Sequence, residues 1–192
     1  ISDTISSVSI TGASLSSASS LSGKSNLTYI NLSGNNLTSF NPSSNQLSSV
    51  NLSNNNLDSI EWLSDSSDTI TFVDVSGNQL NEFPATSVDD FPSLSTLRIS
   101  DNNLSALVVP KTVTELEFDE MTLTSLPDLS AQEGNYLELK MTSGLSSSQM
   151  QTILKTIPTS FTLDLVLNNM EFPNESWWID LGVQKITASG DI

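Results

Sequence analysis

Two nearly identical stretches constrain the fold of this chain more than any other feature. The first covers residues 27–37 and reads L-x-x-I-x-L-x-x-N-x-L, and almost the same string returns over residues 47–57, 20 residues further on. Self-similarity at such a spacing indicates a stacked-repeat architecture, in which each repeat buries its apolar face only against its neighbours. We therefore expect a fold that exists only as a stack of such units.

Each position in the repeat has its own physical reason. Ile30 and Leu32 alternate with polar residues, which is the period of a strand with one buried face, so both should point into the stack. Asn35 falls where the chain turns off the strand, and its amide can satisfy backbone groups that a buried turn leaves unpaired. Equivalent residues should form a ladder along the stack, interrupted where Met121 takes this position. The predicted ladder consists of Asn35, Asn55, Asn78, Asn102 and Asn168.

The pattern continues along the chain with irregular spacing. The expected strands have centres near residues 8, 30, 50, 73, 97, 116, 137, 163 and 186. In the weaker seventh repeat, Leu137 and Leu139 form the inward pair. Residues 146–157 read instead as a helix, because apolar residues recur there at helical spacing, a serine can cap its start and Pro158 follows its end.

This pattern resembles that of the leucine-rich repeat family over nearly the whole chain, most strongly from Leu27 to Leu107. The resemblance implies an α/β solenoid: a right-handed superhelix of about nine repeats, with a short-stranded parallel sheet on its concave side and a mostly irregular convex side. We expect a single domain over residues 1–192. Because neither end carries a convincing cap, we expect it to be a fragment of a longer protein.

Charge and composition restrict the partners. The chain has 6 Lys and Arg residues against 22 Asp and Glu residues, a formal net charge of −16, so we expect no nucleic-acid partner and no anionic membrane surface. No apolar run approaches the roughly 20 residues of a membrane-spanning helix. The absence of cysteine excludes disulfides and zinc–thiolate sites. No loop has the spacing of a calcium motif, so we expect neither a metal nor a cofactor.

The resemblance implies that ligands bind on the concave sheet. There the outward residues are neutral near the N-terminus and acidic further on, and the alignment of repeats places Tyr136 beside Glu115 and Glu138 beside Glu117. Aromatic and arginine residues are the usual anchors of interfaces. The candidate ligand-binding residues are Tyr29, Phe72, Asp74, Arg98, Glu115, Glu117, Tyr136 and Glu138. The partner would be a protein, peptide or glycan, basic or polar; the alternative is a solvated face on an acidic protein.

Six N-x-S/T sequons favour a secreted protein, although a sequence rich in Ser and Asn raises the number of chance matches. They begin at Asn26, Asn31, Asn36, Asn51, Asn103 and Asn174. Asn31 and Asn51 should point outward from the sheet. Asn36 and Asn103 directly follow ladder residues and should be exposed.

Catalysis has little support in the sequence. The chain has no His and no Cys, which excludes Ser-His-Asp and Cys-His arrangements. Glu115 and Glu117 lie on an open sheet, with no pocket to shift their pKa values. We therefore expect an extracellular ligand-recognition module, not an enzyme.

The chain resembles the ectodomain of a receptor-like protein or receptor-like kinase, of protist or oomycete rather than plant type, with any kinase domain on another segment. The alternatives are a structural or adhesive surface protein and an intracellular scaffold.

Overall fold

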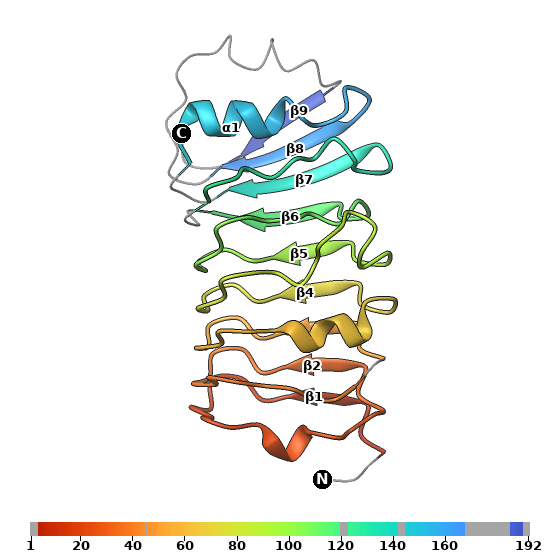
Figure 1. Ribbon diagram of the computed structural model, residues 1–192, viewed down its shortest axis with the longest axis vertical. Helices are drawn as coiled ribbons and strands as arrows, with labels where there is room; N and C mark the ends of the chain where they lie inside the picture. Colours follow the sequence, from red (N-terminus) through yellow and green to blue (C-terminus); the bar gives the residue numbers. More distant parts are fainter. Residues whose placement is uncertain (1–3, 45, 120–122, 142–144, 168–184, 190–192) are drawn as a thin grey trace.

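The computed structural model describes residues 4–44, 46–119, 123–141, 145–167 and 185–189, and it forms one stack of parallel strands (Figure 1). A single nine-stranded sheet has the order β1-β2-β3-β4-β5-β6-β7-β8-β9, so every strand pairs with its neighbours in sequence. The strands are β1 (Ser7–Ser9), β2 (Tyr29–Asn31), β3 (Ser49–Asn51), β4 (Phe72–Asp74), β5 (Thr96–Arg98), β6 (Glu115–Phe118), β7 (Tyr136–Met141), β8 (Thr162–Leu167) and β9 (Lys185–Ser189). Each strand contains one of the predicted strand centres.

The connecting segments are mostly irregular. They include two 3-10 helices, η1 (Ser19–Leu21) and η2 (Glu61–Ser66), and one α-helix, α1 (Ser147–Leu154). The side chain of Ser146 accepts a hydrogen bond from the backbone of Gln149, whose side chain accepts one from the backbone of Ser146. This reciprocal cap fixes the start of the helix where the sequence predicts it. The helix ends at Leu154, three residues before the predicted end at residue 157.

The alternation of each strand places its aliphatic residues in the interior. On β3 the side chain of Val50 is 0% exposed, as is that of Leu52 directly after the strand, while Ser49 and Asn51 face outward. The same holds for Val73 and Val75 in the next coil, at 0% and 1% exposed. Burial of these residues against the equivalent residues of neighbouring coils is the main stabilising contribution in such a stack.

Buried asparagines bridge successive coils. The Nδ2 atom of Asn55 donates to the carbonyls of Leu52 in its own coil and Leu32 in the preceding one, both at 3.0 Å, and its Oδ1 atom accepts from the backbone of Leu37 at 3.0 Å. Asn35, Asn78 and Asn102 make equivalent bonds. Asn168 and Met121 lie outside the described residues.

A second ladder, which the sequence analysis missed, follows the start of the strands. The hydroxyls of Ser48, Thr71 and Ser95 each donate to the carbonyl of the equivalent residue one coil earlier, at 2.9 to 3.0 Å. Thr28 and Thr114 do the same at 3.2 and 3.4 Å. The signal was present in the sequence, because a Ser or Thr follows the first apolar residue in each of these coils.

One turn position in each of the first five coils has a left-handed backbone. It holds Gly12, Gly34, Asn54, Gly77 and Asp101, all with φ between 53° and 67°. These are the residue types that tolerate this conformation. At Gly77 the neighbouring coil adds a steric reason, since a Cβ atom there would lie 2.8 Å from Oδ1 of Asn54.

The predicted alignment of repeats is wrong by two residues at β7. Glu138 pairs with Glu115, not Glu117, and Lys140 occupies the place beside Glu117. The reason is the length of β7, which buries Leu137, Leu139 and Met141 and uses the last two to continue the inward rows of β6. Consequently Tyr136 lies two residues before Glu138, the first residue of β7 that pairs with β6.

Candidate functional site

The outward side chains form two rows along the open face of the sheet. The first row, set by the strand register, is Ser7, Tyr29, Ser49, Phe72, Thr96, Glu115, Glu138 and Asp164. The second row is Ser9, Asn31, Asn51, Asp74, Arg98, Glu117, Lys140 and Val166. Both rows are uncharged at the N-terminal end; the second row carries its first charge on β4 and the first row on β6.

In three successive coils the second row also builds the turn that ends the strand. Oδ1 of Asn51 accepts hydrogen bonds from the backbone N and the hydroxyl of Ser53, at 3.0 and 2.8 Å. Asn31 does the same with Ser33, and Asp74 with Ser76. A short side chain with a carbonyl or carboxylate oxygen is what this Asx turn requires.

The pattern breaks in the next coil, where Arg98 occupies the second row. A guanidinium only donates hydrogen bonds, so it cannot accept from Ser100, the equivalent of Ser53 and Ser76. Ser100 is 4% exposed, and within the described residues its hydroxyl has no hydrogen-bond partner. Arg98 therefore cannot form the Asx turn that Asn51 and Asp74 form in the preceding coils.

This difference predicts opposite outcomes for two matched substitutions. Ser53→Ala removes a satisfied hydroxyl and should lower the free energy of unfolding by about 1 kcal/mol, whereas Ser100→Ala removes an unsatisfied one and should be neutral or stabilising. Urea unfolding of both variants beside the parent chain measures the difference. Equal destabilisation by the two substitutions would show that the Ser100 hydroxyl is in fact paired.

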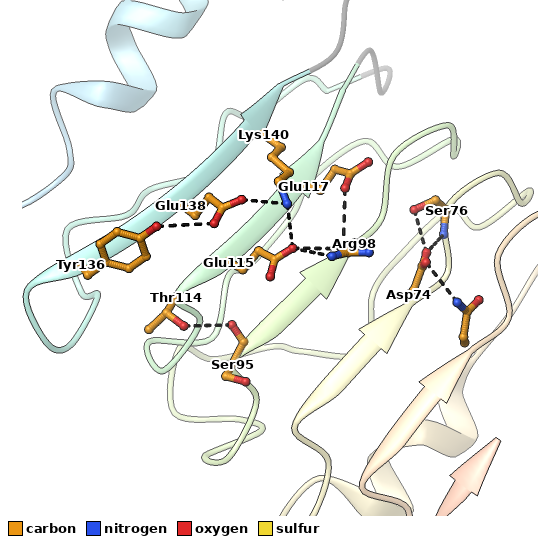
Figure 2. Close-up of polar contacts among 11 residues, drawn as sticks. Asp74, Ser76, Ser95, Arg98, Thr114, Glu115, Glu117, Tyr136, Glu138 and Lys140 are labelled. Carbon is orange, nitrogen blue, oxygen red and sulfur yellow. Dashed lines mark hydrogen bonds and ion pairs between the residues drawn. The ribbon is translucent and has the colours of Figure 1, made fainter. Parts of the chain in front are cut away.

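Arg98 instead enters a charge network across β5, β6 and β7 (Figure 2). Oε1 of Glu115 accepts hydrogen bonds from Nη2 and Nε of Arg98, at 2.7 and 3.1 Å, and from Nζ of Lys140 at 2.9 Å. Lys140 also contacts Oε1 of Glu138 at 2.8 Å. The carboxylate of Glu117 lies 3.7 Å from Nε of Arg98, so it is the weakly paired member of the network.

The predicted aromatic residues lie at different distances from this network. The guanidinium carbon of Arg98 is 5.6 Å from the ring centroid of Phe72, within cation–π range. The hydroxyl of Tyr136 donates to Oε2 of Glu138 at 3.4 Å, and the ring is 38% exposed. Tyr29 is equally exposed, but β2 is three strands from β5, about 14 Å along the stack. The structure thus brings together all the candidate ligand-binding residues except Tyr29, and adds Lys140.

The two glutamates of β6 differ in their electrostatic state. Burial opposes the ionisation of Glu115, but the hydrogen bonds from Arg98 and Lys140 outweigh it and lower the pKa. Burial raises the pKa of Glu117, and neighbouring Asp74 and Glu115 add to the shift against the opposing effect of Arg98 and Lys140. Of these two glutamates, Glu117 therefore gains more from an additional cation.

These shifts give a prediction for the dependence of stability on pH. Because its pKa is lowered in the folded chain, ionised Glu115 stabilises the fold above its unfolded pKa, and this contribution is lost as pH falls through its folded pKa. Glu117 has the opposite sign: its pKa is raised in the folded chain, so the free energy of unfolding declines as pH rises through its folded pKa. At pH 7, Glu115→Gln should lower the free energy of unfolding by about 0.5–1 kcal/mol, and Glu117→Gln should leave it unchanged or raise it. Urea unfolding across pH 3 to 8 tests both signs, and a less stable Glu117→Gln variant would contradict the assignment.

The sequons occupy two kinds of position. Asn31 and Asn51 are half-buried members of the second row, whereas Asn26, Asn36 and Asn103 are exposed outside it. Asn174 lies outside the described residues.

In the described ranges there is no group of three or more His, Cys, Asp or Glu residues placed to hold a metal ion. The helices among the described residues are all too short or too polar to cross a membrane.

Comparison with known protein families gives a match over one short part of the chain. Residues 26–45 match the sequence model of the family described as Leucine Rich Repeat. Together with the parallel one-strand-per-coil sheet, this match supports a leucine-rich repeat protein with a solenoid-like fold. No curated protein matches the chain.

Proposed function

We propose that this chain is a recognition module that binds a protein partner through the charged part of its open sheet face, from β4 to β8. Leucine-rich repeats are typically non-catalytic modules for protein–protein interaction, which favours a protein as the partner. A peptide or glycan ligand would use the same face.

The proposal depends mainly on one observation: Arg98 occupies the second-row position at which the three preceding coils have a turn-forming Asn or Asp. Three coils keep the Asx turn, and the fourth gives it up and leaves a buried hydroxyl unpaired. Sequences depart from their own fold-supporting pattern mainly at functional positions. Arg98 also stacks near Phe72, and arginine beside an aromatic ring is a common anchor of interfaces.

The charges of this face favour a basic partner. Five carboxylates lie there, on Asp74, Glu115, Glu117, Glu138 and Asp164, against the two cations Arg98 and Lys140. Glu115 is satisfied by both cations, while Glu117 has one contact at 3.7 Å and a raised pKa. A lysine or arginine of the partner would pair with Glu117 and favour its ionised form.

We place the module outside the cell, as part of a receptor-like protein or receptor-like kinase, because exposed sequons fit passage through the secretory pathway. Labelling of intact native cells with a membrane-impermeant biotin reagent tests the location. Recovery of the chain only after lysis would favour an intracellular scaffold.

The same proposal includes the architecture of the stack: a right-handed superhelix of about nine repeats with the sheet on its concave side, in one domain over residues 1–192. Parallel crossovers in one sheet are right-handed in about 98% of cases.

A displayed library of random peptides tests the binding face on the folded chain. Selected peptides should be rich in Lys and Arg, and their affinity should fall when Glu117→Gln is introduced. Glu82→Gln is the matched control, because Glu82 is exposed on the segment between β4 and β5. Binding that is insensitive to Glu117→Gln but sensitive to Glu82→Gln would place recognition elsewhere.

A further inference from the structure

Four of the five described sequons fall into two classes, one half-buried on the sheet face and one exposed outside it. In the first class, the amide of Asn31 or Asn51 is itself part of the fold. Oδ1 of Asn31 accepts from the backbone N and the hydroxyl of Ser33 at 3.1 and 2.8 Å, so both sequon side chains are engaged. Asn51 makes the same contacts with Ser53, and its Nδ2 atom donates to Oδ2 of Asp74 at 3.3 Å.

The next coil shows what this position requires. Asp74 makes the same turn with Ser76, at 3.2 and 2.9 Å, although an aspartate has no nitrogen to carry a sugar. The feature common to the three coils is thus an acceptor oxygen followed two residues later by a serine. The N-x-S sequences at Asn31 and Asn51 are explained by this turn without any modification.

The second class lies on the exposed surface of the coils. Asn36 and Asn103 hold the same position in two coils, directly after the buried ladder residues Asn35 and Asn102, and both side chains are exposed. Backbone N–H groups at this position donate to the preceding coil, so each site is anchored while its side chain stays outside the stack. The sequon residues Thr38 and Ser105 are also exposed. A bulky carbohydrate at these sites would displace no neighbouring coil and would leave the sheet face open.

We infer that the folded chain accepts N-linked glycans at Asn36 and Asn103, whereas Asn31 and Asn51 are protected in the folded chain because their sequons form the turns after β2 and β3. The inference rests on the secretory location proposed above. The donor is a lipid-linked oligosaccharide diphosphate. Nδ2 of the asparagine forms a bond to the anomeric carbon of the first sugar, the bond from that carbon to the diphosphate oxygen breaks, the lipid diphosphate leaves, and one amide proton is lost to a base.

The test uses the folded, unmodified chain from a bacterial host, incubated with an oligosaccharyltransferase and a lipid-linked oligosaccharide. Enzymatic release of the glycans in heavy-oxygen water, followed by peptide mass spectrometry, identifies each modified asparagine. The control is a synthetic peptide of residues 28–40, which contains the sequons of Asn31 and Asn36 without the stack. The peptide should be modified at both sites. The folded chain should be modified at Asn36 and Asn103 and lose modification at Asn31 and Asn51.

Modification of Asn31 or Asn51 in the folded chain to the extent seen at Asn36 would overturn the inference. So would a folded chain unmodified at both Asn36 and Asn103 under conditions that modify the peptide. Because the reaction is performed on the purified chain, its result is independent of where the native protein resides. A cytosolic native protein would therefore refute the proposed location while leaving the selection among sequons measurable.

Discussion

Asn55→Ala is expected to destabilise the chain by about 3–5 kcal/mol, because several buried backbone groups lose their partner at once and each unsatisfied group costs about 1–3 kcal/mol. The side chain is 7% exposed and serves the carbonyls of Leu32 and Leu52 and the N–H of Leu37. Alanine replaces none of these bonds. The midpoint of urea unfolding measures the global loss, and faster hydrogen exchange of the Leu37 amide reports it locally.

Asn56→Ala is the matched control, since it changes the same residue type one position further on, where the side chain is exposed. Substitutions of this kind usually change the free energy of unfolding by no more than about 0.5 kcal/mol. If the two variants unfolded at the same urea concentration, the asparagine ladder would not contribute to stability and the bridging role of Asn55 would be wrong.

Arg98→Asn is expected to separate binding from stability. The introduced amide can accept from Ser100 as Asn51 does from Ser53, a gain of about 1 kcal/mol that offsets the lost pairing with Glu115 and Phe72, each worth about 0.5–1 kcal/mol. The free energy of unfolding should thus stay within about 1 kcal/mol of the parent. Binding of library-selected peptides should weaken at least about 10-fold, as for other interface anchors. Calorimetric titration and urea unfolding measure the two quantities.

Arg98→Ala provides the comparison, because alanine removes the same contacts without restoring the turn. It should bind as weakly as Arg98→Asn and be the less stable of the two. An Arg98→Asn variant that keeps full affinity would remove Arg98 from the binding face. One that is less stable than Arg98→Ala would contradict the assignment of the turn.

The strands were predictable because each buries a short alternation of aliphatic residues, and this signal survives irregular spacing. Ile30 and Leu32, or Val73 and Val75, fix both the position of the strand and the face that it hides. The two outward rows follow from the same alternation, which is why most candidate residues lie together on one face. The predicted alignment held as far as β6, where strands of three or four residues leave no choice of register.

What the sequence did not reveal depends on contacts between coils. The register of β7 is decided by Met141, a third inward residue that a short-strand pattern does not anticipate, and Lys140 was missed for the same reason. The Asn/Asp-x-Ser motif is visible in the sequence, but its meaning comes from hydrogen bonds within a turn. The bonds at Asn31, Asn51 and Asp74 show that Arg98, in the next coil, is the residue at which this run of turns ends.

Thiol accessibility along β3 tests the central claim most directly, because the chain has no cysteine of its own. Single substitutions Ser49→Cys, Val50→Cys, Asn51→Cys and Leu52→Cys introduce one reporter at a time into consecutive positions. If one strand per coil hides its aliphatic residues and displays the others, S49C and N51C will react rapidly with a maleimide. V50C and L52C will then react at least about 100-fold more slowly, because their labelling requires local opening worth roughly 3 kcal/mol. Rapid labelling of V50C and L52C with protection of S49C and N51C would contradict both the fold and the binding face built on it.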